Sequence, residues 1–368
     1  MPVGLVVSKW SKKMGVVQVA AHPPEAAGDA KAQATFLQLF GQHQATEEPG
    51  IITMLVGSVN YMSFYTGADT NHMVTLVLRY DEDPDQYEDG LESIASQVVQ
   101  NLEGEAFKHI LPSLYHWISQ YPSLELEQRL ALMLTDEVKR AILTLLRSEG
   151  SIIKTELGSL LKDRLGGERI ELDLVLNNLV KYELVKVSSA KGLPSDLVQL
   201  VSDLMVLRVP PLKIFQECTS MGLPEELVKR YKWELKSFFG EYRPSNEDEL
   251  KLLDVLANPA AYTVLKLLRT SIITRNELEK LRKKGVDDVE GVLSLLEGAD
   301  VVVRLTLAGG GDREYIALKS NPVVKRFFPR YVIDVVRANQ REGRKSPAEL
   351  LEYLQQLELA YFASTAKK

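Results

Sequence analysis

The feature that most constrains this chain is an internal duplication that covers its last two-thirds. Two segments of a first copy, Leu143–Arg147 (LTLLR) and Ser151–Leu157 (SIIKTEL), recur in a second copy as LKLLR and SIITRNEL. Further on, Ser202–Arg208 matches Ser320–Arg326, and a proline follows three residues after each arginine. The matched segments keep their order at offsets of 117 to 122 residues. Matched order at near-constant spacing predicts a unit of about 120 residues that is present twice.

Each copy of the repeat predicts three helices followed by a β-hairpin. The first helix begins at Asp136 and ends at Gly150 in one copy, and it begins at Asn258-Pro259 in the other. Hydrophobic spacing places the other elements at 154–163, 170–182, 184–187 and 197–201 in the first copy, and at 274–284, 287–297, 301–307 and 315–319, turned at Gly309–Gly311, in the second. Two closing helices follow in each copy, at 211–221 and 224–239 and at 330–342 and 346–362. This order of elements resembles the winged helix-turn-helix superfamily.

The first 122 residues predict a separate α+β domain. Apolar and β-branched runs predict strands at 3–10, 15–21, 51–56, 61–65 and 72–80, with helices at 31–43, 85–101 and 104–119. The order ββαβββαα resembles the longin and roadblock group of profilin-like domains, which implies a five-stranded antiparallel sheet with helices on its faces. The predicted fold class is therefore α+β, with a longin-like domain at 1–122. Two mostly helical winged-helix repeats with C-terminal helices follow at 123–243 and 244–368.

Charge differs between these regions, while the rest of the composition is ordinary. Residues 1–122 hold 6 Lys/Arg against 14 Asp/Glu, whereas the other 246 residues hold 38 against 36. The single cysteine, Cys218, excludes an internal disulfide and a cysteine-based metal cluster, and suits a reducing cytoplasm. No apolar run reaches the ~18 residues of a membrane span. We expect a soluble cytoplasmic protein.

The motifs of catalytic sites are missing from the sequence. It contains no phosphate-binding loop of the GxxxxGKS/T type and no GxSxG elbow. The five histidines lack zinc-ligand spacing, and the acidic run Asp81–Asp85 lacks the glycine-centred loop of a calcium site. We therefore expect no enzyme, no catalytic residues, no metal and no cofactor.

The resemblance to longin and roadblock domains implies a non-catalytic domain that binds a small GTPase or another domain of the same group. Followed by winged helices, this layout resembles in outline the nitrogen permease regulator-like proteins, some of which supply an arginine to Rag GTPases. Arg79, at the end of a predicted strand, is the only arginine in residues 1–122. We favour the interpretation that Arg79 is a solvated strand-end charge, and we do not transfer the catalytic role to it.

Winged helices often read DNA through their third helix, which requires outward basic or amide side chains. The third helix of the first copy carries Glu168, Glu171 and Asp173 against Arg169, with Asn177, Asn178 and Lys181 later. In the second copy it carries Asp287, Asp288, Glu290 and Glu297, without a basic residue from 286 to 300. Carboxylates at this position repel phosphates, so the sequence disfavours DNA at this face, above all in the second copy.

Other basic residues keep a nucleic-acid contact open. Lys280, Arg282, Lys283 and Lys284 form a compact cluster at the end of the second helix of the second copy. A solvated helix end with a favourable dipole is the alternative interpretation, which we prefer. Matched Arg208 and Arg326 are either partner contacts or, as we prefer, ion pairs that tie the wing to the following helix.

Two functional hypotheses follow. The first is a non-enzymatic adaptor or regulator that binds protein partners, including a small GTPase, through the longin-like domain and the tandem winged helices, as in assemblies resembling endosomal-sorting and condensin-partner subunits. The alternative is a DNA-binding transcription regulator with a sensing N-terminal domain. Both leave a homodimer open.

Overall fold

The computed structural model describes residues 1–366 except 12, 29, 47–48, 167–169, 171, 191 and 307–313. The predicted glycine turn at 309–311 and the charges of Glu168, Arg169 and Glu171 lie outside these described residues. The chain divides into two compact units, Met1–Leu124 with Glu171–Asn178, and Glu125–Ile170 with Leu179–Lys368. Each unit is described by itself below.

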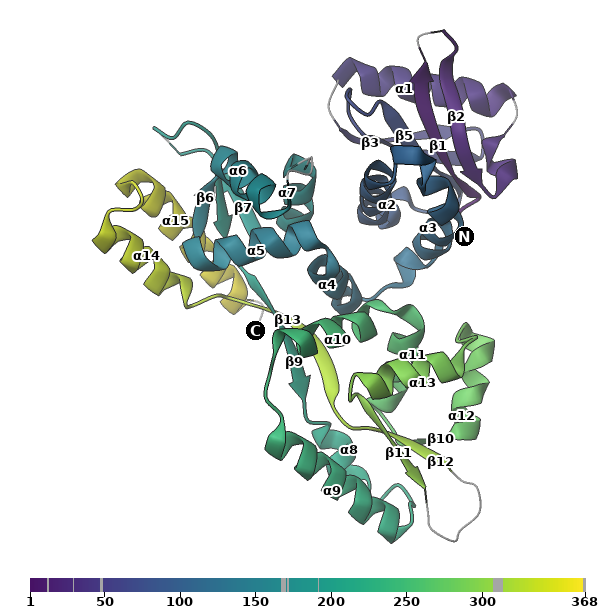
Figure 1. The fold of residues 1–368 in the computed structure, drawn as a ribbon, viewed down its shortest axis with the longest axis vertical. Helices are drawn as coiled ribbons and strands as arrows, with labels where there is room; N and C mark the ends of the chain where they lie inside the picture. The colour runs from purple at the N-terminus through teal and green to yellow at the C-terminus, as the bar shows by residue number, and fades with distance from the viewer. Residues whose placement is uncertain are drawn as a thin grey trace. The chain divides into compact units, whose positions relative to one another are not determined.

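The N-terminal unit contains a five-stranded antiparallel sheet in the order β2-β1-β5-β4-β3 (Figure 1). Its strands are β1 (Gly4–Ser11), β2 (Gly15–His22), β3 (Gly50–Val56), β4 (Val59–Tyr65) and β5 (His72–Arg79). Its helices are α1 (Ala30–Thr46), α2 (Glu88–Gln100) and α3 (Phe107–Gln120), with short 3-10 turns at Pro24–Ala27, Pro84–Tyr87, Glu103–Glu105 and Tyr121–Ser123. Each predicted strand and helix of this domain is present, with ends shifted by a few residues.

Both faces of this sheet are covered, because apolar residues occupy successive positions of the central strands. Leu5, Val6 and Val7 are all fully buried in β1, and successive side chains of a strand point to opposite faces. Val6 belongs to the core cluster that holds Phe36 and Phe40 of α1. The helices α2 and α3 lie on the other face (Figure 1). The unit is therefore a three-layer α/β/α sandwich.

One buried histidine lies in this core. The Nε2 atom of His43 in α1 is 2.8 Å from Ser63 Oγ, and its ring stacks on that of Tyr65 at 5.6 Å between centroids. Burial lowers the pKa of His43 to about 4, against the opposing effect of the hydrogen bond with Ser63. His43 is therefore neutral at physiological pH.

The second unit contains the two repeats, whose elements follow one another in the same order. The first repeat has α4 (Leu126–Thr135), α5 (Glu137–Glu149), β6 (Ser151–Ile153), α6 (Lys154–Arg164), α7 (Leu172–Lys181), β7 (Val185–Ser188), β8 (Leu197–Leu200), β9 (Asp203–Val209), α8 (Leu212–Glu217) and α9 (Glu225–Glu241). The second has α10 (Asn246–Ala257), α11 (Pro259–Leu268), β10 (Ile273–Thr274), α12 (Arg275–Glu279) with the 3-10 turn Lys280–Lys284, α13 (Val289–Gly298), β11 (Val302–Thr306), β12 (Glu314–Leu318), β13 (Asn321–Phe327), α14 (Val332–Glu342) and α15 (Pro347–Ala366). The predicted fold class, an α+β chain with an N-terminal five-stranded antiparallel sheet followed by mostly helical repeats, is confirmed. Most of α7, up to Asn178, groups with the N-terminal unit rather than with the second unit.

The repeats differ from the sequence-based expectation in two ways. Each small sheet has three strands rather than two, in the orders β6-β8-β7 and β10-β12-β11, because a short strand before the second helix joins the hairpin. The segments around Arg208 and Arg326, to which the sequence assigned no structure, are the strands β9 and β13. They pair with each other, antiparallel, from Asn321 opposite Val209 to Phe327 opposite Asp203.

This strand pair is self-complementary. Val206 lies opposite Val324, and these two residues are themselves equivalent at the offset of 118 that relates Arg208 to Arg326. Equivalent residues can face each other in this way only about a local two-fold axis, as in a symmetric dimer interface. The two repeats therefore pair about an approximate two-fold axis through Val206 and Val324.

Beyond the paired strands, the closing helices of each repeat pack on the other repeat (Figure 1). Tyr231 of α9 donates a hydrogen bond to the carbonyl of Leu318 in the second repeat, at 2.8 Å. Its counterpart in α15, Tyr353, donates to the carbonyl of Leu200 in the first repeat, at 2.9 Å. Gly150 makes room for this contact, because a Cβ atom there would lie 2.7 Å from Tyr353 Cε1. The repeats thus exchange their C-terminal helices.

Candidate functional site

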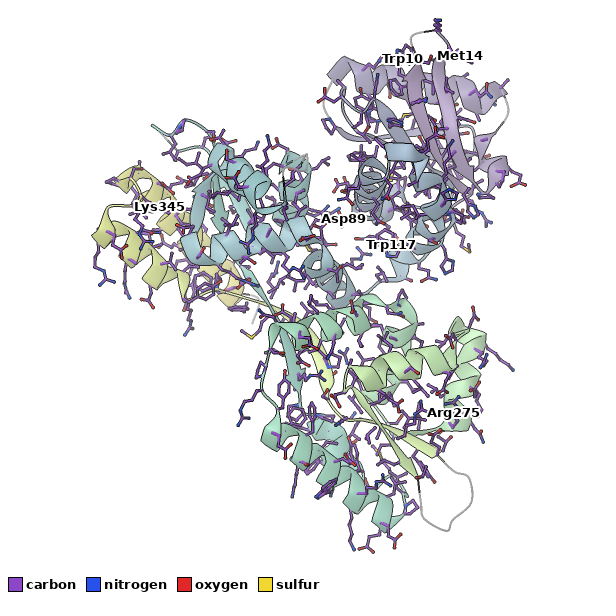
Figure 2. The ribbon with its side chains drawn as sticks, viewed as in Figure 1. Trp10, Met14, Asp89, Trp117, Arg275 and Lys345 are labelled. Carbon is purple, nitrogen blue, oxygen red and sulfur yellow. The ribbon has the colours of Figure 1, made fainter. Side chains whose placement is uncertain are left out.

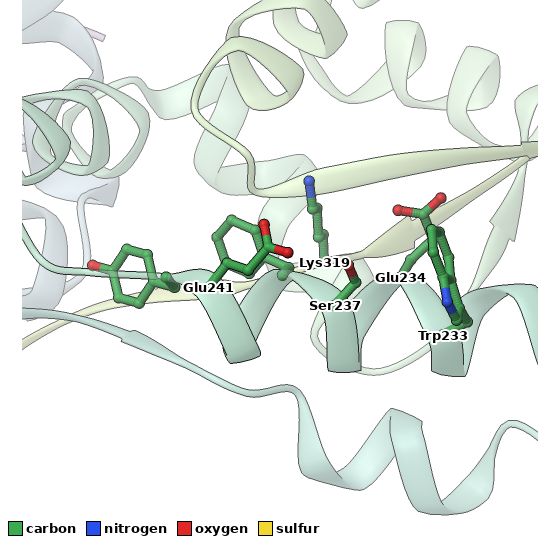
Figure 3. A pocket seen from close by; sticks show the side chains of 7 residues that line it. Trp233, Glu234, Ser237, Glu241 and Lys319 are labelled. Atoms are coloured by element: carbon green, nitrogen blue, oxygen red, sulfur yellow. The ribbon is translucent and has the colours of Figure 1, made fainter.

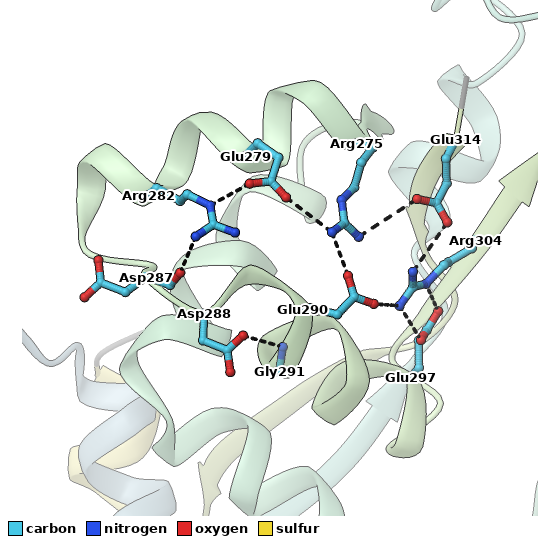
Figure 4. A network of polar contacts seen from close by, with 10 residues as sticks. All are labelled: Arg275, Glu279, Arg282, Asp287, Asp288, Glu290, Gly291, Glu297, Arg304 and Glu314. Carbon is cyan, nitrogen blue, oxygen red and sulfur yellow. Dashed lines mark hydrogen bonds and ion pairs between the residues drawn. The ribbon is translucent and has the colours of Figure 1, made fainter. Parts of the chain in front are cut away.

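The third helix of the second repeat, α13, presents a strongly charged surface together with α12 and the hairpin strands β11 and β12 (Figure 4). The Asp288 side chain caps α13 by accepting a hydrogen bond from the backbone N–H of Gly291 at 2.9 Å. The apolar side of the helix, with Val289, Leu293 and Leu296 among its residues, is buried. The carboxylates of α13 consequently lie on its outer side.

Two arginines bind the carboxylates of this surface from neighbouring elements. Arg275, which begins α12 (Figure 2), lies 2.6 Å from Glu290 Oε2 and 3.2 Å from Glu279 Oε1. Arg304 of β11 donates to Glu290 at 2.8 Å and to Glu297 at 2.9 Å. Both arginines also approach Glu314 of β12, at 4.0 and 3.5 Å. Through these bridging carboxylates the network joins the helices α12 and α13 to the hairpin strands β11 and β12.

The arginines in this network are engaged by carboxylates rather than free to bind an anion. Hydrogen bonds from Arg304 and Arg275 lower the pKa of the exposed Glu290 carboxyl. Hydrogen bonds to Glu297 and Glu290 raise the pKa of Arg304. The ten residues drawn in Figure 4 include three arginines against six acidic residues. This surface therefore carries net negative charge and repels a phosphate backbone.

The predicted basic cluster lies beside this network, and its members have different surroundings. Arg282 pairs with Glu279 at 2.6 Å and donates to the carbonyl of Asp287 at 2.9 Å. Lys280 and Lys283 are exposed in the 3-10 turn that follows α12. The side chain of Lys284 lies outside the described residues. Lys280, Arg282 and Lys283 are thus all exposed, and Arg282 is the one of the three that the Glu279 carboxylate engages.

Arg208 and Arg326 occupy equivalent ends of the paired strands but have different surroundings. The side chain of Arg208 is 2% exposed and forms an ion pair with Asp248 of α10. It also donates to Ser320 Oγ at 2.7 Å and to the carbonyl of Asp300 at 3.2 Å. These partners belong to the second repeat, so Arg208 ties the two repeats together and not, as expected, the wing to the following helix. The pairing of β9 with β13 causes this difference, and local sequence does not reveal that pairing.

Arg326 makes a looser joint. It donates to the carbonyl of Tyr182 at 2.8 Å and pairs with Glu183 at 2.8 Å, while 35% of its side chain stays exposed. Both partners belong to the first repeat. Arg326 therefore also joins the repeats, with fewer contacts than Arg208.

Arg79 lies exposed at the end of β5, opposite Val59 of β4. Its backbone N–H donates to Glu82 Oε2 at 3.0 Å. The next residue, Tyr80, has 67% of its surface exposed. Arg79 belongs to the N-terminal unit, whereas the α13 network belongs to the second unit.

Sequence reasoning missed Arg275 and Arg304, the two residues that organise the α13 network. The available signal was their position, one at the start of the second helix and one in the wing strand, each across from the acidic third helix. Within the described residues, no group of three or more His, Cys, Asp or Glu side chains is arranged to hold a metal ion. No helix of the described chain is both long and apolar enough to cross a membrane. No protein-family model matches the chain, and a search of the curated proteins finds no match.

Proposed function

We propose that this protein is a non-enzymatic adaptor or regulator that binds other proteins. The observation that carries the proposal is the outer surface of α13, where Arg275 and Arg304 are bound to carboxylates. In a winged helix that reads DNA, this surface faces the major groove and its cations face phosphates. Here the surface is acidic and exposed, which suits a basic or polar protein partner.

The N-terminal domain supplies a second expected contact, and the resemblance to longin and roadblock domains favours a small GTPase there. Exposed apolar side chains support a protein-binding role. Met14, at the β1–β2 turn (Figure 2), has 77% of its surface exposed and Leu37 of α1 has 50%. Leu37 Cδ1 lies 3.9 Å from the position of a Cβ on Gly15, the residue that follows Met14.

The test compares partners recovered by the wild type and by a variant whose α13 surface is neutralised in charge. Asp287→Lys with Ser294→Arg adds cations at exposed positions without removing an arginine of the network. Lys213→Glu, an exposed position on α8, is the matched control. We expect quantitative affinity purification from native extract to recover a partner with wild type and control that the α13 variant loses. Recovery of the same proteins by all three would contradict a role for α13.

A DNA-binding regulator is the second candidate, favoured by the exposed pair Lys280 and Lys283. An electrophoretic shift on random duplexes at about 0.15 M salt separates the two candidates. We expect no saturable shift with the wild type. Saturable binding that Lys280→Glu with Lys283→Glu abolishes would favour the DNA-binding candidate instead.

A further inference from the structure

Each repeat contains a pocket at the same place, beside the exchanged helix of the other repeat. In the second repeat the pocket has a volume of about 350 Å³ and is lined by α9 and by Lys319 (Figure 3). In the first repeat the pocket has a volume of about 440 Å³ and is lined by α15, Val201 and Arg326 among others. Tyr231 and Tyr353 show how residues of α9 correspond to residues of α15, because each tyrosine donates to the equivalent backbone carbonyl, that of Leu318 or Leu200. At this offset of 122, Phe238 matches Ala360 and Tyr242 matches Ser364.

Two aromatic rings of the first repeat and a carboxylate of the second repeat close over Arg208. The guanidinium carbon of Arg208 lies 5.6 Å from the ring centroids of both Phe238 and Tyr242. Asp248 accepts from Arg208 Nε at 3.0 and 2.9 Å and from the Tyr242 hydroxyl at 2.7 Å. Rings and carboxylate together leave Arg208 almost without solvent contact, as a buried ion pair requires.

Arg326, the matching arginine of the second repeat, lacks these three closing groups. Ala360 and Ser364 replace the two rings, and both line the open pocket. The residue that matches Asp248 is Leu126, which begins α4 and is 62% exposed. The alignment of α4 and α10 follows from their buried residues, since Leu130 and Leu134 correspond to Leu252 and Leu256. Arg326 therefore lines its pocket, whereas the molecule's own side chains screen Arg208 from the corresponding pocket.

We propose that the Arg326 pocket binds an acidic peptide segment of a partner protein, in which a carboxylate side chain stands next to an aromatic ring. The surroundings of Arg208 provide the template, because a carboxylate and two rings occupy the corresponding space there. The exposed Lys186 at the rim adds a second cation. Glu183, the one acidic side chain among the lining residues, pairs with Arg326 at 2.8 Å, so the peptide carboxylate has to share the guanidinium with it. The cavity volume falls within the range of about 300–1,000 Å³ that is usual for ligand sites. This inference concerns a different surface from α13 and does not depend on the role proposed for that helix.

The experiment is a calorimetric titration of the full chain with the capped peptide acetyl-Ser-Tyr-Asp-Phe-Ser-amide, whose one carboxylate is the aspartate side chain. Control peptides carry asparagine for the aspartate, or alanine for both aromatic residues. Arg326→Gln removes the cation. Ala360→Phe with Ser364→Tyr, called the filled variant, places over Arg326 the two rings that cover Arg208. Arg326→Gln changes a part-exposed side chain outside the core, so it decides the question even if the filled variant does not fold.

We expect binding to the wild type, binding at least about tenfold weaker to Arg326→Gln, and none to the filled variant. The asparagine and alanine peptides are expected to bind the wild type at least about tenfold more weakly. The proposal is overturned if the wild type does not bind the peptide, if Arg326→Gln binds it equally, or if the asparagine peptide binds as well. Competition by sodium acetate as strong as by the peptide would also overturn it, since the site would then take a simple anion. Because these variants leave α13 unchanged, failure here is distinct from failure of the adaptor function.

Discussion

The two repeats share every major element, yet they treat the same arginine in opposite ways. Arg208 of the first repeat is sealed by Asp248, Phe238 and Tyr242, and it serves as a structural joint. Arg326 of the second repeat keeps the strand position but meets small side chains and an open cavity. Three substitutions at matched positions thus separate a closed joint from a pocket. The comparison teaches that duplication preserves the backbone joint while side chains at its edge are free to diverge.

The largest effect is expected from removing each arginine in turn. Arg208→Met leaves the Asp248 carboxylate without its ion-pair partner and should lower the free energy of unfolding by about 3 kcal/mol. Arg326→Met removes a part-exposed pair with Glu183 and should cost less than about 1 kcal/mol. Urea denaturation of both variants measures the difference. Equal losses would show that the two joints are equivalent in energy and would break the comparison.

The next largest effect is expected at the tyrosine contact that the two repeats share. Tyr231→Phe and Tyr353→Phe each leave a buried carbonyl oxygen without its hydroxyl donor, so each should lower the free energy of unfolding by about 1–2 kcal/mol. Because the two tyrosines make the same contact about the local two-fold axis, the losses should agree within about 0.5 kcal/mol. Thermal and urea unfolding of the two variants, with the double variant to check additivity, provide the measurement. A loss confined to one tyrosine would mean that only one of the exchanged helices is held in this way.

A smaller effect is expected from filling the open pocket. Ala360→Phe with Ser364→Tyr places rings over Arg326, as in the second repeat, and should raise the free energy of unfolding by about 1 kcal/mol. Leu126→Asp, a change at the position that matches Asp248, should add to this gain only when the rings are present. Urea denaturation of the double and triple variants checks both statements. A destabilised double variant that still folds would indicate that α15 leaves no space for the rings.

The smallest effect is a difference in acid sensitivity. Burial disfavours the charged form of Asp248, but hydrogen bonds from Arg208 and Tyr242 outweigh it and lower the pKa of the carboxyl. A folded-state pKa below the unfolded value means that the stabilisation is present above about pH 4 and is lost as the pH falls further. Asp248→Asn should therefore flatten the fall in stability below pH 4, measured by thermal unfolding across a pH series. Leu126→Asn, at the matched position, should leave the pH profile unchanged.

Much of the fold could be predicted from the sequence because its signals are local. Alternating and continuous apolar runs located the five strands of the N-terminal sheet, and capping residues such as Asn258 located helix starts. The acidic character of α13 was also visible in the sequence. Its ion pairs with Arg275 and Arg304 were not, since those residues come from elements that only folding brings together. The strands β9 and β13 were missed for the same reason, because each is stabilised by pairing with the other, 118 residues away.

The sequence by itself determined that one unit is present twice, which elements it contains, and that no familiar catalytic motif accompanies it. Only the tertiary structure decided which copy each closing helix packs on. Because the two copies present equivalent surfaces, the sequence allows a closing helix to pack on either copy. The pairing of β9 with β13 places each closing helix on the other copy. The same choice decided that Arg208 would be buried and Arg326 part-exposed, because the acidic partner of each arginine, Asp248 or Glu183, comes from the other repeat.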